Sequence, residues 1–166
     1  MSPRKYTKTK REAASEAVRQ RILQSTLALH SQKGIFGTSW KDIAKHADVS
    51  LATVYNYFPS LDELVPACGE LMAAIAQPPS LSDADTIFAD ASTVEERIAS
   101  LVKTLFDFYE RGELYLEIDH QERTLQSVQE WEAYLKELID GLTRIALKPV
   151  KPNKRMVEAF GALLDV

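Results

Sequence analysis

The chain has 166 residues, of which 45% are apolar and 27% are charged. This size and composition are typical of one globular domain or two small ones, and they exclude an α/β barrel, a disordered protein and a collagen-like protein. The sequence has a single cysteine, Cys68, and neither a long apolar run nor a signal segment. We therefore expect a cytoplasmic protein without disulfides and without a membrane as partner.

The net charge of −4 is divided unevenly along the sequence. Residues 1–66 carry 10 Lys and Arg against 6 Asp and Glu, a net charge of +4, whereas residues 67–166 carry 10 against 18, a net charge of −8. Five of the cations precede the first apolar periodicity: Arg4, Lys5, Lys8, Lys10 and Arg11. A basic N-terminal part favours a polyanionic partner such as DNA, although a basic tail also serves as a solubilising arm.

The first predicted elements are a long helix and a short one. Apolar residues at helical spacing predict a helix that runs from Glu12 to Lys33, and Gly34 is a typical residue after a helix end. Ser39 followed by Asp42 has the spacing of a capping box, which predicts a second helix of about two turns.

Two further helices are predicted in the first half of the chain. Ser50 is placed to cap a helix over residues 51–58. Ser60 with Glu63 forms another capping box, for a helix that runs to about residue 76. A turn of three residues, 48–50, joins the second and third helices.

The second half of the chain is predicted to be helical as well. Prolines and an acidic Ser/Asp/Ala stretch predict a loop over residues 77–92. Thr93 with Glu96 caps a helix that continues to Gly112. Residues 113–123 carry a mixed signal, which we assign to helix because an all-α chain offers a strand no partner.

The last two predicted helices carry continuous apolar stripes. Ser127 with Glu130 caps a long helix whose stripe extends to Ile145. Pro152 or Asn153 begins a final helix that still runs at the end of the sequence. The sequence therefore predicts an all-α fold.

The two short helices and their turn have the arrangement of a helix-turn-helix. In that motif the second helix enters the major groove of DNA, which is about as wide as a helix, and the first helix crosses the backbone. Short helices with tight turns also occur in bundles that do not bind DNA, so the spacing alone leaves both interpretations open.

The residues of this segment carry a more specific signal. The run from Gly37 to Ser60, continued to Leu64, closely resembles the signature of TetR-family transcriptional regulators. The features that agree are Gly34, Thr38, Ile43 with Ala44, Val49 with Ser50, Thr53, Tyr55, and Tyr57 with Phe58. The resemblance implies a three-helix DNA-binding domain with a basic N-terminal arm over residues 1–66, and a helical ligand-binding and dimerisation domain over residues 67–166.

Three positions depart from the family pattern. Asp48 stands where glycine is usual in the turn, and aspartate adopts the left-handed conformation at modest cost. Leu61 replaces a common lysine, which removes one expected phosphate contact. In the first helix, we interpret His30 as a hydrogen-bonded core histidine rather than a ligand.

The resemblance assigns DNA contact to the start of the second helix and to the third helix. Tyr55 and Thr53 suit phosphate oxygens, and Asn56 suits adenine. Trp40 is either a packing residue or a backbone contact, and we favour packing, whereas Tyr57 can do both. The candidate DNA-binding residues are Ser39, Trp40, Lys41, Ser50, Leu51, Ala52, Thr53, Tyr55, Asn56 and Tyr57.

The resemblance also implies an effector site and a homodimer interface in the second domain. The candidate ligand-binding residues are Phe106, Tyr109, Tyr115, Trp131 and Tyr134, whose spacing fits plain core packing equally well. The candidate dimer residues are Met156, Phe160, Leu163 and Leu164. The family usually dimerises through two C-terminal helices and this sequence has one, so we expect either a truncated chain or a homodimer weaker than is usual in the family.

The sequence has no catalytic constellation, no phosphate-binding glycine-rich loop and no metal-ligand spacing, so we expect neither an enzyme nor a bound cofactor or metal. Our hypothesis is a transcriptional regulator, a repressor that binds a palindromic operator as a homodimer and is released by a small-molecule effector. The alternative is a helical interaction or adaptor protein that retains the helix-turn-helix as a scaffold.

Overall fold

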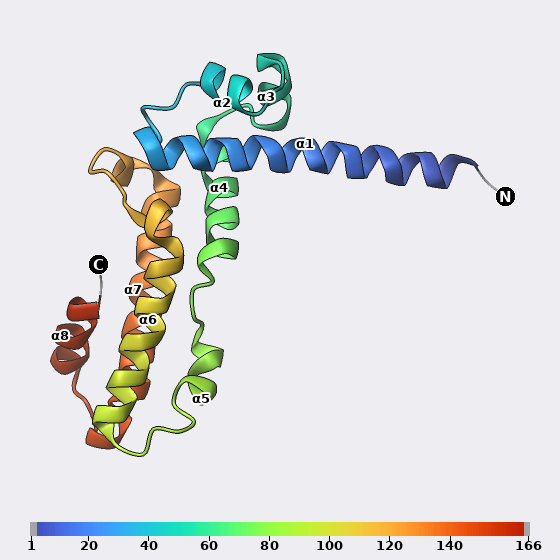
Figure 1. The fold of residues 1–166 in the computed structure, drawn as a ribbon. Helices are drawn as coiled ribbons and strands as arrows, with labels where there is room; N and C mark the ends of the chain where they lie inside the picture. The colour runs from blue at the N-terminus through green and yellow to red at the C-terminus, as the bar shows by residue number, and fades with distance from the viewer. Residues whose placement is uncertain (1–2, 165–166) are drawn as a thin grey trace. The chain divides into compact units, whose positions relative to one another are not determined.

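The computed structural model describes residues 3–164, and all regular structure within them is helical (Figure 1). The predicted all-α fold is therefore confirmed. The chain forms two compact units, the first comprising Met1–Met72 with Glu117–Glu122 and the second comprising Ala73–Leu116 with Arg123–Val166. Among the described residues, no helix is long and apolar enough to cross a membrane.

The first unit begins with one long helix, α1 (Pro3–Lys33). This helix starts at Pro3 and not at Glu12, so the predicted start is wrong. The segment before residue 12 lacks apolar periodicity, but Lys, Arg and Glu are good helix formers. Extending an existing helix costs much less than nucleating a new one, so the helix continues through this polar segment.

Three shorter helices follow α1 in chain order: α2 (Trp40–His46), α3 (Leu51–Tyr57) and the first part of α4 (Leu61–Ala76). Helix α2 packs against both α1 and α3. The core side chains of this unit are almost completely buried, and they include Ile22, Leu23, Ile43, Ala47, Val54 and Leu64. This apolar contact holds the two short helices in place on α1, because helices of seven residues are unstable in isolation.

The second unit is built around the pair α6 (Val94–Leu116) and α7 (Gln126–Ala146), with α8 (Lys154–Leu164) packed on α7 (Figure 1). Its core is a cluster that α6 and α7 share with the segment before α6. The buried members are Ala84, Phe88, Leu101, Leu105, Leu138, Ile139, Leu142 and Ala146. Arg97 donates hydrogen bonds to the carbonyl oxygens of Ile145 and Ala146 and so caps the end of α7.

Three of the boundaries predicted for the second half of the chain are wrong. The predicted loop over 77–92 contains a 3₁₀ turn, η1 (Leu81–Asp83), and a one-turn helix, α5 (Ala84–Ile87). Asp83 accepts from the backbone of Ser80 at 2.7 Å, a capping interaction that starts this helical segment although it has no apolar periodicity.

The other two boundaries concern the chain between α6 and α7. Helix α6 ends at Leu116, so most of the 113–123 segment is not α-helical, and a 3₁₀ turn, η2 (Glu122–Thr124), follows. Helix α7 begins at Gln126, which places Ser127 inside the helix and not at its cap. By contrast, the capping box of Thr93 with Glu96 is confirmed by hydrogen bonds in both directions.

Candidate nucleic-acid interface

The turn between α2 and α3 depends on a left-handed residue. Asp48 has φ 51°, the conformation for which glycine is usual. The amide of Val49 donates to the carbonyl of Ala44 at 3.0 Å, which closes the end of α2. The predicted role of aspartate at this position is therefore confirmed, and the turn keeps its helix-turn-helix form.

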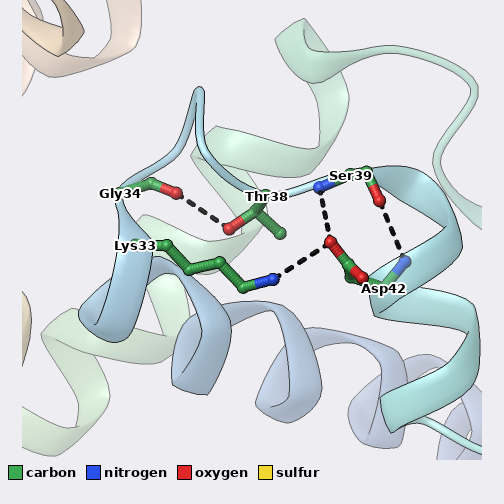
Figure 2. A network of polar contacts seen from close by, with 5 residues as sticks. All are labelled: Lys33, Gly34, Thr38, Ser39 and Asp42. Atoms are coloured by element: carbon green, nitrogen blue, oxygen red, sulfur yellow. Dashed lines mark hydrogen bonds and ion pairs between the residues drawn. The ribbon is translucent and has the colours of Figure 1, made fainter.

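The start of α2 is fixed by a network of side chains shown in Figure 2. Asp42 accepts from the amide of Ser39 at 3.4 Å, while Ser39 Oγ accepts from the amide of Asp42 at 3.1 Å. This reciprocal pair confirms the predicted capping box. Lys33 Nζ lies 3.0 Å from the same carboxylate and ties it to the last turn of α1.

These contacts also lower the pKa of Asp42. Its pKa lies below the ordinary value, first because of the hydrogen bond from Lys33 and then because of those from Ser39. Thr38 completes the network in Figure 2 by donating from Oγ1 to the carbonyl of Gly34 at 2.8 Å. The segment between α1 and α2 is thus held at both ends by side-chain hydrogen bonds.

Two glycines in this segment occupy positions that exclude a side chain. Gly34 has φ 73°, a left-handed conformation after the last residue of α1. At Gly37 a Cβ atom would lie 2.0 Å from the carbonyl oxygen of Lys33, so the backbone here passes directly over the end of α1. The path from α1 into α2 therefore depends on glycine at both positions.

Helix α3 divides into a buried side and an exposed side. Val54, and Phe58 directly after the end of α3, are buried in the unit. Ala52, Tyr55 and Asn56 are exposed, with Lys41 exposed on α2. The structure therefore gathers the predicted contact residues of α3 on the side that is free of internal packing.

The aromatic rings of Trp40 and Tyr55 stack with their centroids 4.9 Å apart. Trp40 is the first residue of α2 and is half-buried, whereas Tyr55 is 43% exposed on α3. This contact packs Trp40 on α3, the candidate recognition helix, and not under the first helix. The stack restricts the orientation of the Tyr55 ring.

Several candidate hydroxyl groups are already engaged within the unit. Ser50 Oγ accepts from the amide of Thr53 at 3.0 Å, and the two hydroxyl oxygens lie 2.7 Å apart. Tyr57 is half-buried and its hydroxyl lies 2.8 Å from that of Ser15 on α1. Sequence reasoning missed Ser15, because no local pattern indicates a contact between residues so far apart in the chain.

The comparisons with known proteins agree with this geometry. Residues 22–68 match the model of the family described as "Bacterial regulatory proteins, tetR family". The protein named HTH-type transcriptional repressor KstR from Mycolicibacterium smegmatis is 29% identical, over 57% of this chain and 65% of its own. Residues 22–68 therefore form a DNA-binding domain of the TetR family.

Three further known proteins are similar to this chain. KstR from Mycobacterium tuberculosis is also 29% identical, over 57% of this chain and 60% of its own, so this chain spans less than two thirds of these relatives. The regulator LuxR of Vibrio harveyi is 40% identical, over 28% of this chain and 23% of its own. The solved structure of the multidrug binding protein EbrR complexed with imidazole is similar in fold, with a TM-score of 0.50 and 21% identity over 88% of this chain and 92% of that one.

The environment of His30 differs from the one that the sequence predicts. Its Nε2 atom is buried and has no hydrogen-bond partner, so the expected hydrogen-bonded core histidine is wrong for this nitrogen. Burial lowers the pKa of His30 to about 4. The imidazole is therefore neutral at pH 7 and acts as a packing group of α1.

The candidate effector residues lie on α6 and α7. Trp131 and Tyr134 lie on α7 with ring centroids 5.7 Å apart, and Tyr134 is 46% exposed. Tyr109 donates from its hydroxyl to the carbonyl of Leu164 at 3.0 Å. Phe106 is 62% exposed, and Tyr115 is half-buried near the end of α6.

The candidate dimer residues on α8 divide between its two sides. Leu163 is 80% exposed and Met156 is 39% exposed, whereas Leu164 packs against the core of the second unit and Phe160 is half-buried. Val157 is buried on the side that faces α7. Leu163 and Met156 are thus the apolar residues of the proposed interface that remain available for a partner.

The described residues offer neither a metal site nor a reactive thiol. Within residues 3–164, no group of three or more His, Cys, Asp or Glu side chains is placed to hold a metal ion. Cys68 is buried, which raises the pKa of its thiol to about 12. This thiol is therefore protonated and unreactive in the folded protein.

Proposed function

We propose that this TetR-family protein is a DNA-binding transcriptional regulator, a repressor, that inserts α3 into the major groove. The observation that carries the proposal is the division of α3, whose buried side fixes the helix on α1 and α2 while Ala52, Tyr55 and Asn56 stay exposed. A helix supported in this way presents its outer side chains to base edges without further rearrangement.

The exposed residues suit different parts of the DNA. Asn56 has the amide group that pairs with the N6 and N7 atoms of adenine. Ala52, and the half-buried Leu51 beside it, offer apolar contact to a thymine methyl. Tyr55 and Lys41 are suited to phosphate oxygens, which fix the register of the protein on the duplex.

Ser39, Ser50 and Thr53 contribute to DNA binding by fixing the ends of the helices. Their hydroxyl groups are engaged in the caps of α2 and α3, so they define where each helix begins. Trp40 and Tyr57 orient the outer face, through the stack on Tyr55 and the bond to Ser15. We assign these five residues to the interface mainly as positioning groups.

The charge distribution supports the same partner. Residues 1–66 carry a net charge of +4, from 10 Lys and Arg against 6 Asp and Glu. Neutralising phosphates releases condensed counterions, which makes affinity for DNA depend steeply on salt. The exposed Lys10 and Arg11 on α1 belong to this basic part of the chain.

The proposed operator is palindromic, and the proposed regulator is a homodimer. Two copies of α3 on the same face of the duplex need a separation of about 34 Å or a multiple of it. A small-molecule effector that binds in the second unit and favours a different separation would release the DNA. A coupling free energy of about 1 to 3 kcal/mol is sufficient for such a response.

A titration of fluorescent duplexes at several salt concentrations tests the proposal. The duplexes are selected by the protein from a random-sequence pool. We expect the logarithm of the affinity to fall linearly with the logarithm of the salt concentration, by about 0.9 per phosphate neutralised. A flat salt response, or failure to enrich any sequence, would contradict DNA binding and favour a helical interaction protein.

A further inference from the structure

Glu122 is a buried carboxylate that lies far in sequence from the helix-turn-helix and yet contacts it. Its side chain is only 5% exposed. The carboxylate accepts a hydrogen bond from the backbone amide of Ile35, the second residue after α1. Its other oxygen accepts from the amide of Asp119 at 3.1 Å. Both oxygens of this carboxylate are therefore used, and one of them binds the turn between α1 and α2.

The contact with the turn is close. A Cβ atom added to Gly34 would lie 2.7 Å from Glu122 Oε1, so the carboxylate occupies the space beside this left-handed glycine. The turn then continues through Thr38 and Ser39 into the capping box of α2. The position of α2 and α3 relative to α1 thus depends on a turn that Glu122 helps to hold.

The electrostatic setting is unfavourable for a carboxylate. The C-terminal end of α1 carries the negative end of the helix dipole, which disfavours a nearby negative charge. A buried carboxylate also loses its hydration, a cost that only hydrogen bonds or counter-charges offset. The two backbone amides supply such hydrogen bonds, and the one from Ile35 is lost if the turn moves away.

The segment that carries Glu122 has an unusual place in the chain. Glu117–Glu122 belongs to the first unit, while the helices on either side, α6 and α7, belong to the second. The residue that holds the α1–α2 turn therefore lies in the short segment of chain between α6 and α7.

We propose that Glu122 is a positioning residue for the helix-turn-helix, which sets the α1–α2 turn in the arrangement that binds DNA. This proposal rests on the proposed DNA-binding function. Glu122 itself contacts no DNA and acts through the amide of Ile35.

Two substitutions at Glu122 and one control test the proposal. Glu122→Gln keeps one acceptor oxygen but replaces the other with an amide NH2 group, which can only donate. Glu122→Ala removes both acceptors. Glu117→Gln is the matched control, because Glu117 lies in the same segment and is exposed. Thermal unfolding of each variant verifies that it folds, and Glu122→Gln keeps the test available if Glu122→Ala does not fold.

Two measurements are made on each folded variant. Amide hydrogen exchange of peptides that cover residues 34–39 reports on the turn without any DNA. Titration of duplexes selected by the wild-type protein reports on affinity and its salt dependence. We expect both Glu122 variants to exchange faster at the turn and to bind DNA about fivefold more weakly or worse, with Ala affected more than Gln. The salt slope stays unchanged, because no phosphate contact is lost.

The outcomes separate this proposal from the proposed function. Wild-type exchange at residues 34–39 in both variants would show that Glu122 does not hold the turn. Faster exchange with wild-type affinity would show that the turn does not set DNA binding, and either result overturns the proposal. If the wild-type protein itself binds no duplex, the proposed function fails and the role in DNA binding fails with it, while the exchange data still decide the contact with the turn.

Discussion

The hydroxyl oxygens of Ser15 and Tyr57 lie 2.8 Å apart and join the middle of α1 to the last residue of α3. Together with the buried Val54, this bond fixes the rotation of α3 about its own axis. Tyr57 and Tyr55, two residues apart, consequently have different roles. The hydroxyl of Tyr57 is bonded to Ser15 within the protein, whereas the ring of Tyr55 stacks on Trp40.

Tyr57→Phe is expected to reduce the free energy of unfolding by about 0.5 to 1.5 kcal/mol, because it removes this one hydrogen bond. Tyr55→Phe keeps its aromatic stack and is expected to leave stability unchanged but to weaken binding to all DNA sequences alike. Urea unfolding and duplex titration measure the two effects. A Tyr57→Phe variant with wild-type stability and weakened DNA binding would instead assign Tyr57 to direct contact.

Asn56→Ala is expected to relax the base preference at one operator position by about 1 to 3 kcal/mol. Because Asn56 is exposed, the stability of the variant should equal that of the wild type. Selection from randomised duplexes followed by sequencing measures the preference. Glu70→Gln, at an exposed position on α4, serves as the control. An unchanged preference in Asn56→Ala would remove this residue from base readout.

Alanine substitutions at Gly37 and Gly69 are expected to change the stability of the protein in opposite directions. Gly37→Ala brings a Cβ atom to 2.0 Å from the carbonyl of Lys33, so we expect a loss of about 1 to 3 kcal/mol in stability as the backbone shifts. At Gly69, inside α4, a Cβ atom would meet nothing within 4 Å. Gly69→Ala is therefore expected to stabilise by about 0.5 to 1 kcal/mol. Chemical unfolding of both variants measures these changes, and equal effects would contradict the close approach at Gly37.

Stability is expected to fall as the pH decreases from about 6.5 towards 4, because of His30. Burial lowers the pKa of His30 from 6.5 to about 4, so in this range the unfolded chain binds the proton and the folded protein does not. The predicted loss is at most about 3 kcal/mol. His30→Leu should remove this part of the pH dependence, whereas His46→Gln, at an exposed position, should keep it. Unfolding free energies measured between pH 7 and pH 4.5 decide this, and an unchanged slope in His30→Leu would refute it.

The oligomeric state is expected to depend on Leu163. Its side chain is 80% exposed on α8, and covering such apolar surface contributes about 25 cal/mol per Å². Leu163→Glu is expected to shift the protein towards monomer, while Glu158→Gln, on the same helix and exposed, is not. Sedimentation equilibrium at low micromolar concentration measures both. A dimer unaffected by Leu163→Glu would place the interface elsewhere.

The sequence predicted features whose cause is local. The capping boxes at Ser39 and Thr93 involve residues three apart, so their spacing is visible in the sequence. The left-handed Asp48 follows from the turn that separates two short helices. The resemblance of this segment to TetR-family regulators added the identity of the helix-turn-helix.

Features that depend on contacts between distant residues were not predicted. The bond from Ile35 to Glu122 joins residues 87 positions apart, and the bond from Ser15 to Tyr57 joins residues 42 apart. No spacing rule connects such pairs, because their proximity results from the packing of whole helices. The unpartnered Nε2 of His30 is of the same kind, since the sequence shows the residue but not the atoms around it.

The first unit is made of two separate segments of the chain, which matters for the design of chimeric regulators. A chimera that joins residues 1–72 of this chain to the remainder of another family member exchanges a contiguous piece of sequence, but not a complete structural unit. Such a hybrid leaves Glu122 behind, and the amide of Ile35 then faces whatever residue the new host supplies. Transplanting Glu117–Glu122 along with the N-terminal segment keeps both partners of this hydrogen bond in one molecule.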